Sequence, residues 1–284
     1  MTSASRFPVA LTFDLDAETL WLARDPESAN KPVWLSQGTY GPREGLPRIL
    51  ALLSRHQIQT TFFIPGMVIE RYPEQVRRIL DAGHEIAHHS YSHRWLDTLN
   101  EEQEREEMRR GAEIIQRITG RSPIGYRSPA AEFTLHTVDL MLEFGIKYSS
   151  NMFDADSPYL LQNRGVPTNI VELPFAWCLD DAPFFLYSNR LPGRSMAAPS
   201  AVLETWTREF DGLAAEPARC FVLAMHPQVI GRPSRLWVLE QFIEHASANS
   251  RTWFAPCHEI AAAAAETLMP GTQTGRVTGP SGPV

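Results

Sequence analysis

Three acidic side chains follow directly after the apolar stretch 9–13. The stretch is rich in residues that favour strands, and it runs straight into Asp14, Asp16 and Glu18. Side chains alternate in direction along an extended chain, so Asp14 and Asp16 should point to the same side and concentrate negative charge there. Such a cluster could hold a metal ion, although a solvated loop in which Asp14 caps a turn would leave the same pattern.

Four of the nine histidines lie within residues 84–93. Among them, His89 and His93 have the spacing i, i+4, which on a helical turn would point both imidazoles in the same direction. Two imidazoles and a carboxylate suit zinc, and cobalt, nickel or manganese can use the same donors. Surface histidines also show this spacing by chance, but together with the acidic cluster it predicts a divalent-metal site.

Three further segments place polar or aromatic side chains after short apolar stretches. Arg127 could hold a carboxylate with its planar guanidinium, although a surface ion pair is the simpler explanation of the residue alone. His226 ends the stretch 220–225, where a lone histidine can also be a hydrogen-bonded residue at the rim of the core. Trp177 lies in an aromatic and acidic segment, and packing in the core is its simplest explanation. In parallel α/β folds the carboxyl ends of the strands form the active face, so these side chains are expected to meet there.

Alternating strands and helices must position these side chains. We expect strands at 8–13, 60–64, 85–87, 124–126, 146–149, 170–173 and 220–225, and helices at 67–82, 101–119, 134–144, 234–247 and 257–268. This alternation predicts an α/β fold in which helices close or nearly close a parallel sheet, in one domain over residues 1–269.

Two segments break the alternation. Residues 17–47 form a long connection with Trp21, Trp34 and Tyr40, and we expect a lid over the active face, a subunit contact, or simple loop packing. Residues 270–284 are a Pro- and Gly-rich tail without a core of its own.

The composition is that of an ordinary folded protein. The 284 residues are 43% hydrophobic and carry a net charge of −7 without a basic run, so no nucleic-acid partner is expected. The three cysteines are far apart and form no CxxC pair, which excludes a disulfide framework. We see neither a signal peptide nor an apolar run that could span a bilayer, and therefore expect a cytoplasmic protein without a membrane partner.

Taken in order, the five segments resemble the motifs of the polysaccharide deacetylases of the NodB-homology type, carbohydrate esterase family 4. The resemblance covers residues 8–260 and rests on Thr12–Asp16, His89–His93, Arg127–Pro129, the region of Trp177, and Leu223–His226. It implies a distorted (β/α) barrel of about seven parallel strands and metal-assisted hydrolysis of an acetyl group.

The resemblance also implies a role for individual residues. Asp16, His89 and His93 would bind the metal, Asp14 would be the general base held by Arg127, His226 the general acid, Ala130 an oxyanion donor through its N–H, and Trp177 and Leu223 the lining of the acetyl pocket.

The sequence departs from the family pattern at three points. Leu15 separates two aspartates that are usually adjacent, so Asp14 and Asp16 could exchange roles, or Glu18 could enter the metal shell. Ala176 replaces an aspartate, which leaves the acidic partner of His226 open. The candidates for that partner are Glu172, Asp180 and Asp181. The third motif continues as Ala130-Ala131-Glu132-Phe133 at a place where the family usually has an aromatic residue, a departure that bears on sugar binding.

The acidic patterns and the segments 226–227 and 231–235 resemble a bacterial subgroup of this superfamily. That subgroup includes peptidoglycan deacetylase-like proteins, cyclic-imide hydrolases and metal-independent allantoinases. We therefore expect a metal-dependent hydrolase of non-peptide C–N bonds that removes N-acetyl groups from a carbohydrate. The alternatives are a hydrolase of a small cyclic imide or ureide, and a catalytically silent ligand-binding barrel. Assembly into a homo-oligomer is compatible with each.

Overall fold

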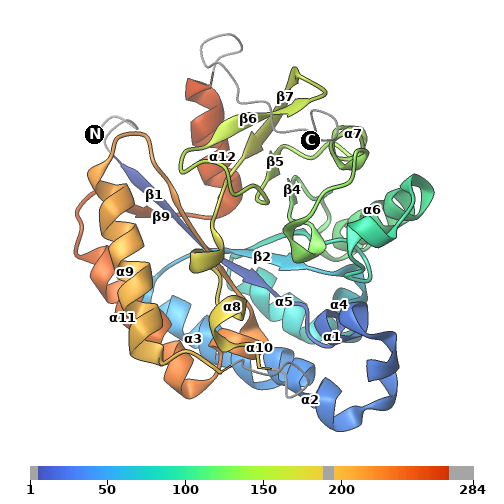
Figure 1. Ribbon diagram of the computed structural model, residues 1–284, viewed down its shortest axis with the longest axis horizontal. Coiled ribbons are helices and arrows are strands. Elements are labelled where there is room, and N and C mark those ends of the chain that lie inside the picture. The colour runs from blue at the N-terminus through green and yellow to red at the C-terminus, as the bar shows by residue number, and fades with distance from the viewer. Residues whose placement is uncertain (1–5, 188–194, 269–284) are drawn as a thin grey trace.

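One curled sheet organises the chain. The computed structural model describes residues 6–187 and 195–268 (Figure 1), so the expected tail at 270–284 lies outside the described residues. The strands are β1 (Phe7–Asp14), β2 (Thr61–Ile64), β3 (Glu85–His88), β4 (Gly125–Tyr126), β5 (Tyr148–Ser149), β6 (Tyr159–Asn163), β7 (Val166–Glu172), β8 (Phe221–Met225) and β9 (Thr252–Phe254). Their order is β6-β7-β5-β4-β3-β2-β1-β8, and β9 pairs with the start of β1.

The pairing confirms the expected α/β fold with a parallel sheet. Neighbouring strands are parallel except β6 and β7, which form an antiparallel hairpin at one edge. The strands β6 and β9 were not expected. After β7 the chain crosses to the other edge of the sheet, where Asp180 forms a parallel bridge with Ala224 of β8. The sheet is therefore a distorted barrel in which the segment after β7 reaches β8.

Helices cover most of the outer face of the sheet, and the last helix packs against its inner face (Figure 1). They are α1 (Thr19–Arg24), α2 (Pro32–Tyr40), α3 (Leu46–His56), α4 (Gly66–Arg71), α5 (Pro73–Asp81), α6 (Glu101–Thr119), α7 (Thr137–Glu143), α8 (Ala182–Phe185), α9 (Pro199–Ala215), α10 (Pro227–Ile230), α11 (Pro233–Ser247) and α12 (Cys257–Thr267). The bounds of α6 agree with its sequence signals, because Asn100 and Gln103 form a capping box and Gly120 ends the helix with φ of 76°.

Alternate side chains of the strands pack in two layers. Phe13 of β1 and Leu223 of β8 face the helices, in a buried cluster with Phe242 of α11. The intervening residues, such as Ala10 and Ala224, face the interior of the barrel, in a cluster that includes residues of α12. Apolar residues on both faces explain why these strands are nearly continuous apolar runs.

Prolines account for two differences from the expected elements. The helix expected at 67–82 is divided into α4 and α5, because Pro73 disfavours helical geometry at Tyr72, which has φ −128° and ψ 51°. The connection 17–47 is helical rather than an irregular loop. Two of its four prolines, Pro26 and Pro32, stand at the first positions of helical turns, where a missing N–H costs nothing.

In the described part of the chain, every helix is too short or too polar to traverse a lipid bilayer. The three cysteines, Cys178, Cys220 and Cys257, are free thiols, as their spacing predicted. A cytoplasmic location, the single-domain bounds and assembly into an oligomer remain predictions.

Candidate active site

The polar side chains singled out above follow the carboxyl ends of parallel strands. Asp14 and Asp16 lie at the end of β1, His89 after β3, Arg127 after β4 and His226 after β8. Five of the eight non-glycine residues with positive φ in the described chain lie next to them: Ala17, Ser90, His93, Ala130 and Ala131. Left-handed backbone at such residues is strained, and strain of this kind gathers at functional sites.

Three buried side chains converge on one point. The Oδ1 atom of Asp16 lies 3.3 Å from Nε2 of His89 and 3.6 Å from Nε2 of His93. All three residues are at least 98% buried, and neither carboxylate oxygen of Asp16 accepts a well-formed hydrogen bond. A buried carboxylate without hydrogen-bond donors lowers the stability of the fold, and a cation between these atoms would replace the missing donors. The donor set therefore fits a divalent metal.

Hydrogen bonding fixes the imidazole of His89 for this purpose. Its Nδ1 lies 2.6 Å from the carbonyl oxygen of Arg127, which can only accept, so Nδ1 carries the proton. The lone pair of Nε2 is left facing Asp16. Metal-binding histidines are commonly oriented by a partner at the other ring nitrogen in this way.

The spacing of His89 and His93 suggested a helical turn, but the structure has none there. Residues 89–93 form a loop after β3, in which Ser90 and His93 have φ of 62° and 63°, and the two rings lie 5.0 Å apart. Glu107 of α6 holds this loop, because its carboxylate accepts hydrogen bonds from Ser90 Oγ, from the N–H groups of Tyr91 and Ser92, and from Ser92 Oγ.

Arg127 is a buried anchor and not a surface ion pair. It is 1% exposed, and it donates to Oδ1 of Asp14 and to Oγ1 of Thr12, both at 2.8 Å, and to both oxygens of Ser150. Its guanidinium also lies over the ring of Phe63. The second oxygen of Asp14, Oδ2, lies 4.0 Å from Nε2 of His89 and therefore faces the convergence point.

His226 is paired with Asp181. The ring Nδ1 lies 2.7 Å from Oδ1 of Asp181, and the N–H of His226 donates to Oδ2 at 3.0 Å. The N–H of Asp181 in turn donates to the carbonyl oxygen of Ala224, so pairing with β8 places this acid. Nε2 of His226 is left 3.7 Å from Oδ2 of Asp16. The structure thus identifies Asp181 as the acidic partner.

Burial and charge together set the ionisation of this group. Burial alone would raise the pKa of Asp16, but the neighbouring His93, His89 and His226 lower it to about 2. Burial lowers the pKa of His226, yet the negative charges of Asp181 and Asp180 outweigh it and raise that pKa well above its usual value. Burial raises the pKa of Asp180 to about 7. The site thus combines an ionised carboxylate with a histidine that retains its proton.

Two of the other acidic candidates have partners outside the convergence point. Glu18 accepts a hydrogen bond from the hydroxyl of Tyr72 at 2.7 Å and lies 3.2 Å from Arg71. Glu172 accepts from the N–H groups of Asn151 and Met152, so it supports the turn after β5 rather than His226. Neither belongs to the group of three metal-type donors.

The three substrate-lining candidates lie in different surroundings. Ala130 is exposed and has φ of 59° in the turn after β4. Trp177 is 51% exposed and stacks on Phe153, which excludes a core position for this tryptophan. Leu223 faces the helices on the opposite side of β8 from the barrel interior. We therefore correct the expectation that the side chain of Leu223 lines the pocket.

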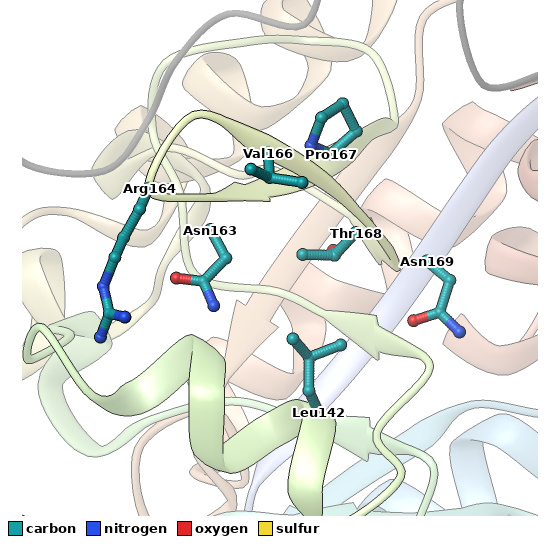
Figure 2. Close-up of a pocket in the computed structure, with 7 residues that line it drawn as sticks. All are labelled: Leu142, Asn163, Arg164, Val166, Pro167, Thr168 and Asn169. Carbon is teal, nitrogen blue, oxygen red and sulfur yellow. The ribbon is translucent and has the colours of Figure 1, made fainter.

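One cavity lies away from the site. A hollow of about 450 Å³ lies between the β6–β7 hairpin and α7 (Figure 2). Asn163 and Arg164, which line it, both donate to Asp139, and Val166 is largely exposed. The hollow carries no cluster of reactive side chains, so the chemistry is assigned to the strand ends.

Known proteins share this architecture. The polysaccharide deacetylase family model matches residues 27–149. The peptidoglycan deacetylase of Helicobacter pylori is 31% identical over 282 residues, which cover 91% of this chain and 96% of the relative. A solved structure from Mycobacterium smegmatis, provisionally described as a polysaccharide deacetylase, is 37% identical with a TM-score of 0.88, and the match covers 97% of this chain and 96% of the other. The structure of Puue allantoinase is 25% identical, with a TM-score of 0.80 and coverage of 94% and 93%.

The curled parallel sheet with polar side chains at its strand ends is a NodB-type distorted barrel. The chain belongs to the polysaccharide deacetylase family of hydrolases.

Proposed function

We propose that this protein is a metal-dependent hydrolase that removes an acetyl group from the nitrogen of a carbohydrate. The observation that carries the proposal is the convergence of Asp16, His89 and His93, whose buried donor atoms lie within 4.8 Å of one another. Two groups that can move protons flank this point, namely Asp14 with Arg127 and His226 with Asp181.

Asp16, His89 and His93 would hold the metal, most simply zinc. A bound divalent metal would lower the pKa of water and stabilise negative charge on the substrate carbonyl oxygen. Only Asp16 of the two aspartates belongs to the group of three donors, whereas Asp14 is bound to Arg127. This difference supports Asp16 as the ligand and Asp14 as the general base.

Asp14 is placed to accept the proton of the attacking water at Oδ2. Its other oxygen receives the hydrogen bond from Arg127, which fixes the direction of the carboxylate. His226 faces the same point with Nε2, while Asp181 keeps Nδ1 protonated and orients the ring. A histidine held in this state can donate its Nε2 proton to the leaving nitrogen.

Two further residues would contact the substrate. The turn at Ala130 would direct a backbone N–H at the developing oxyanion, and such a donor contributes to the stabilisation of acyl-transfer transition states. The exposed ring of Trp177 would cover one side of the acyl group. It touches Phe175, and Phe175 lies under the guanidinium of Arg127.

Metal stoichiometry and activity test this proposal together. Protein purified without a histidine tag should hold about one equivalent of metal, and hydrolysis of N-acetylated sugars should be lost on chelation and restored on re-addition. His89→Ala should remove both metal and activity while the circular dichroism spectrum stays unchanged. Full metal occupancy in that variant would overturn the ligand assignment.

A second candidate function is hydrolysis of a cyclic imide or ureide. The likeness to Puue allantoinase over 94% of this chain favours it. Succinimide, hydantoin and allantoin should be screened beside N-acetylated oligosaccharides. Turnover of the sugars alone would reject this candidate, and turnover of a cyclic compound alone would reject the deacetylase.

A further inference from the structure

Two aromatic rings lie open to solvent beyond the carboxyl ends of neighbouring strands. Phe153 follows β5 and is 41% exposed, and its ring stacks on that of Trp177, which follows β7, with the ring centroids 4.8 Å apart. Two large aromatic side chains side by side leave apolar surface in water, and such surface often marks a binding site. The function proposed above uses Trp177 but gives Phe153 no role.

The backbone beneath these rings is fixed. β5 and β7 pair in parallel, and this pairing continues past their ends, because the N–H of Phe175 donates to the carbonyl oxygen of Met152 at 3.1 Å. The turn after β5 is also held by Glu172, whose buried carboxylate accepts hydrogen bonds from two successive N–H groups of that turn. The two rings therefore stand on neighbouring segments that a ligand would not have to order, which favours binding.

Phe175 connects the stacked pair to the proposed catalytic groups. Its buried ring lies 5.0 Å from the ring of Phe153 and 6.5 Å from that of Trp177, and the guanidinium of Arg127 lies over it at 4.9 Å. Arg127 in turn holds Asp14, the proposed base. The exposed pair is thus separated by one buried ring from the group that orients the base, and it lies beside the proposed acyl position.

The shape and chemistry of the pair suit a sugar ring. The planes of the two rings are inclined by only 28°, so their exposed parts together form a broad apolar surface. A pyranose presents C–H groups on its faces and hydroxyl groups around its rim. It can therefore pack one face on an aromatic ring while its hydroxyl groups stay in contact with water or with polar side chains.

We propose that Phe153, together with Trp177, forms a platform for a second sugar unit, next to the unit that loses its acetyl group. The inference rests on the proposed function, in which Trp177 covers the acyl group of the reacting sugar. Phe153 extends the apolar surface from Trp177, where the next unit of a chain would lie. The preferred substrate is therefore an oligosaccharide or polysaccharide, and Phe153 is a residue that determines this preference.

Binding can be measured without any hydrolysis. Calorimetry on chelator-treated wild-type protein should compare N-acetylglucosamine with its linear trimer, triacetylchitotriose. We expect the trimer to bind at least about tenfold more tightly, because it can occupy the platform and the acyl position together. Phe153→Ala should lower the affinity for the trimer by about tenfold and leave the affinity for the monomer unchanged.

Three further variants identify what the ring contributes. Phe153→Leu keeps an apolar side chain but has no flat ring, so it should lose affinity for the trimer as Phe153→Ala does. Phe153→Tyr retains the ring and should bind the trimer like wild type. Trp237→Ala should also behave like wild type, because it removes an aromatic side chain of similar exposure from α11, which follows β8 at the opposite edge of the sheet.

Kinetics distinguish a contact with the substrate from mere support of Trp177. On zinc-loaded protein, Phe153→Leu should raise KM for the trimer by about tenfold with little change in kcat, and it should leave hydrolysis of the monomer unchanged. Equal losses for monomer and trimer would show that Phe153 only supports Trp177, and would overturn the proposal.

The platform and the proposed function fail separately. Equal trimer affinity in wild type and Phe153→Ala, or no preference of wild type for the trimer, would overturn the platform even if the protein hydrolyses the sugars. Trimer binding that depends on Phe153 without any hydrolysis on metal-loaded protein would support the platform and reject the deacetylase.

Discussion

Arg127 illustrates how a single residue connects the motifs of this site. Its side chain holds Asp14 and Thr12 of the first strand, and its carbonyl oxygen fixes His89. One arginine therefore orients both the proposed base and a proposed metal ligand. Lysine has no planar fork and could not reproduce these contacts, so the residue type is determined by geometry as well as by charge.

Asp181 is the residue whose replacement tests the proton donor. Asp181→Asn keeps the shape but offers an N–H where His226 now donates, so the imidazole should turn or change tautomer. We expect kcat to fall by about 10²- to 10⁴-fold with little change in stability, by analogy with triad aspartates. Steady-state kinetics on metal-loaded protein would measure this.

Asp180→Asn is the matched control for that variant. The carboxylate of Asp180 lies 3.8 Å from Nδ1 of His226, which is too far for a hydrogen bond that would orient the ring. Its replacement should therefore reduce kcat much less than the replacement of Asp181. Equal losses in the two variants would contradict the assignment of Asp181 as the orienting partner.

For individual residues, the sequence predicted which side chains share the active face but not which of them are in contact. Position after strands predicted that Asp16, His89, Arg127 and His226 would lie on one face, because parallel strands bring their carboxyl ends together. The choice of Asp181 over Asp180 depended on the bridge to Ala224, which is a long-range pairing that no local pattern encodes.

Helix α6 contributes to the site through a residue that the sequence did not mark. Glu107 is one of several acids on this helix, and only the fold shows that it holds the loop of His89 and His93. α6 can approach because Gly111 has no side chain, since a Cβ there would meet the ring of His88 at 2.7 Å.

Glu107→Gln should therefore loosen the metal site. An amide cannot accept all of the hydrogen bonds that the carboxylate accepts, so the loop should lose its fixed geometry and metal affinity should fall by about 10- to 100-fold. Competition with a chelator measures the affinity. Glu106→Gln is the control, because Glu106 is exposed and pairs with Arg109. Unaltered affinity in Glu107→Gln would exclude the positioning role.

The start of β3 should make stability dependent on pH. Nδ1 of His84 accepts the N–H of Thr60, and burial lowers the pKa of His84 to about 4. The unfolded chain has a histidine pKa of about 6.5, so between pH 6.5 and 4 it binds a proton that the native state does not. Stability is therefore complete above this window and falls as the pH falls through it, by about 3 kcal/mol for His84.

His84→Asn retains an acceptor for Thr60 and cannot titrate. Denaturant unfolding across the same pH range should show a shallower loss of stability in this variant than in wild type. His136→Asn, at the surface, should retain the wild-type slope. The same slope in all three proteins would show that His84 is protonated in the native state.

Among the elements, prolines explain the least accurate predictions. In 17–47, Pro26 and Pro32 begin helical turns, whereas Pro73 divides a helix, although both segments were predicted from the same local propensities. Proline restricts the residue itself and its predecessor, but whether it starts or ends a helix depends on what the following residues pack against. The helix at 101–119 was predictable because its caps are local.

For the whole molecule, alternation of strands and helices predicted a parallel sheet and the family resemblance predicted its curling into a distorted barrel, whereas the edges of the sheet were not predicted. The antiparallel strand β6 and the return of the chain to β8 involve partners far apart in sequence. Sheet closure depends on such pairings rather than on local propensity. The site therefore depends on the pairing of several strands, because its metal-type donors follow β1 and β3 and His226 follows β8.

Metal binding should accordingly stabilise the whole fold. A metal that binds the native state alone adds about 2.7 kcal/mol at a free concentration of 100 times Kd, which corresponds to an increase in melting temperature of about 5 °C or more. Zinc titration followed by calorimetry should show this increase, and chelation should reverse it. Glu18→Gln should retain the response, because Glu18 is bound to Tyr72 and lies outside the donor group.

Asp16→Asn separates the stability that the metal contributes from the stability of the barrel itself. The variant keeps the shape of the side chain but removes a ligand of the proposed metal, so its stability relative to metal-free wild type measures what the carboxylate contributes to the fold itself. Added zinc should then leave its melting temperature unchanged. A variant that is less stable without metal would mean that Asp16 supports the fold directly. A zinc response equal to that of wild type would mean that the ion binds elsewhere. A rise in melting temperature that requires both Asp16 and the metal is the result expected if the ion is held by Asp16, His89 and His93.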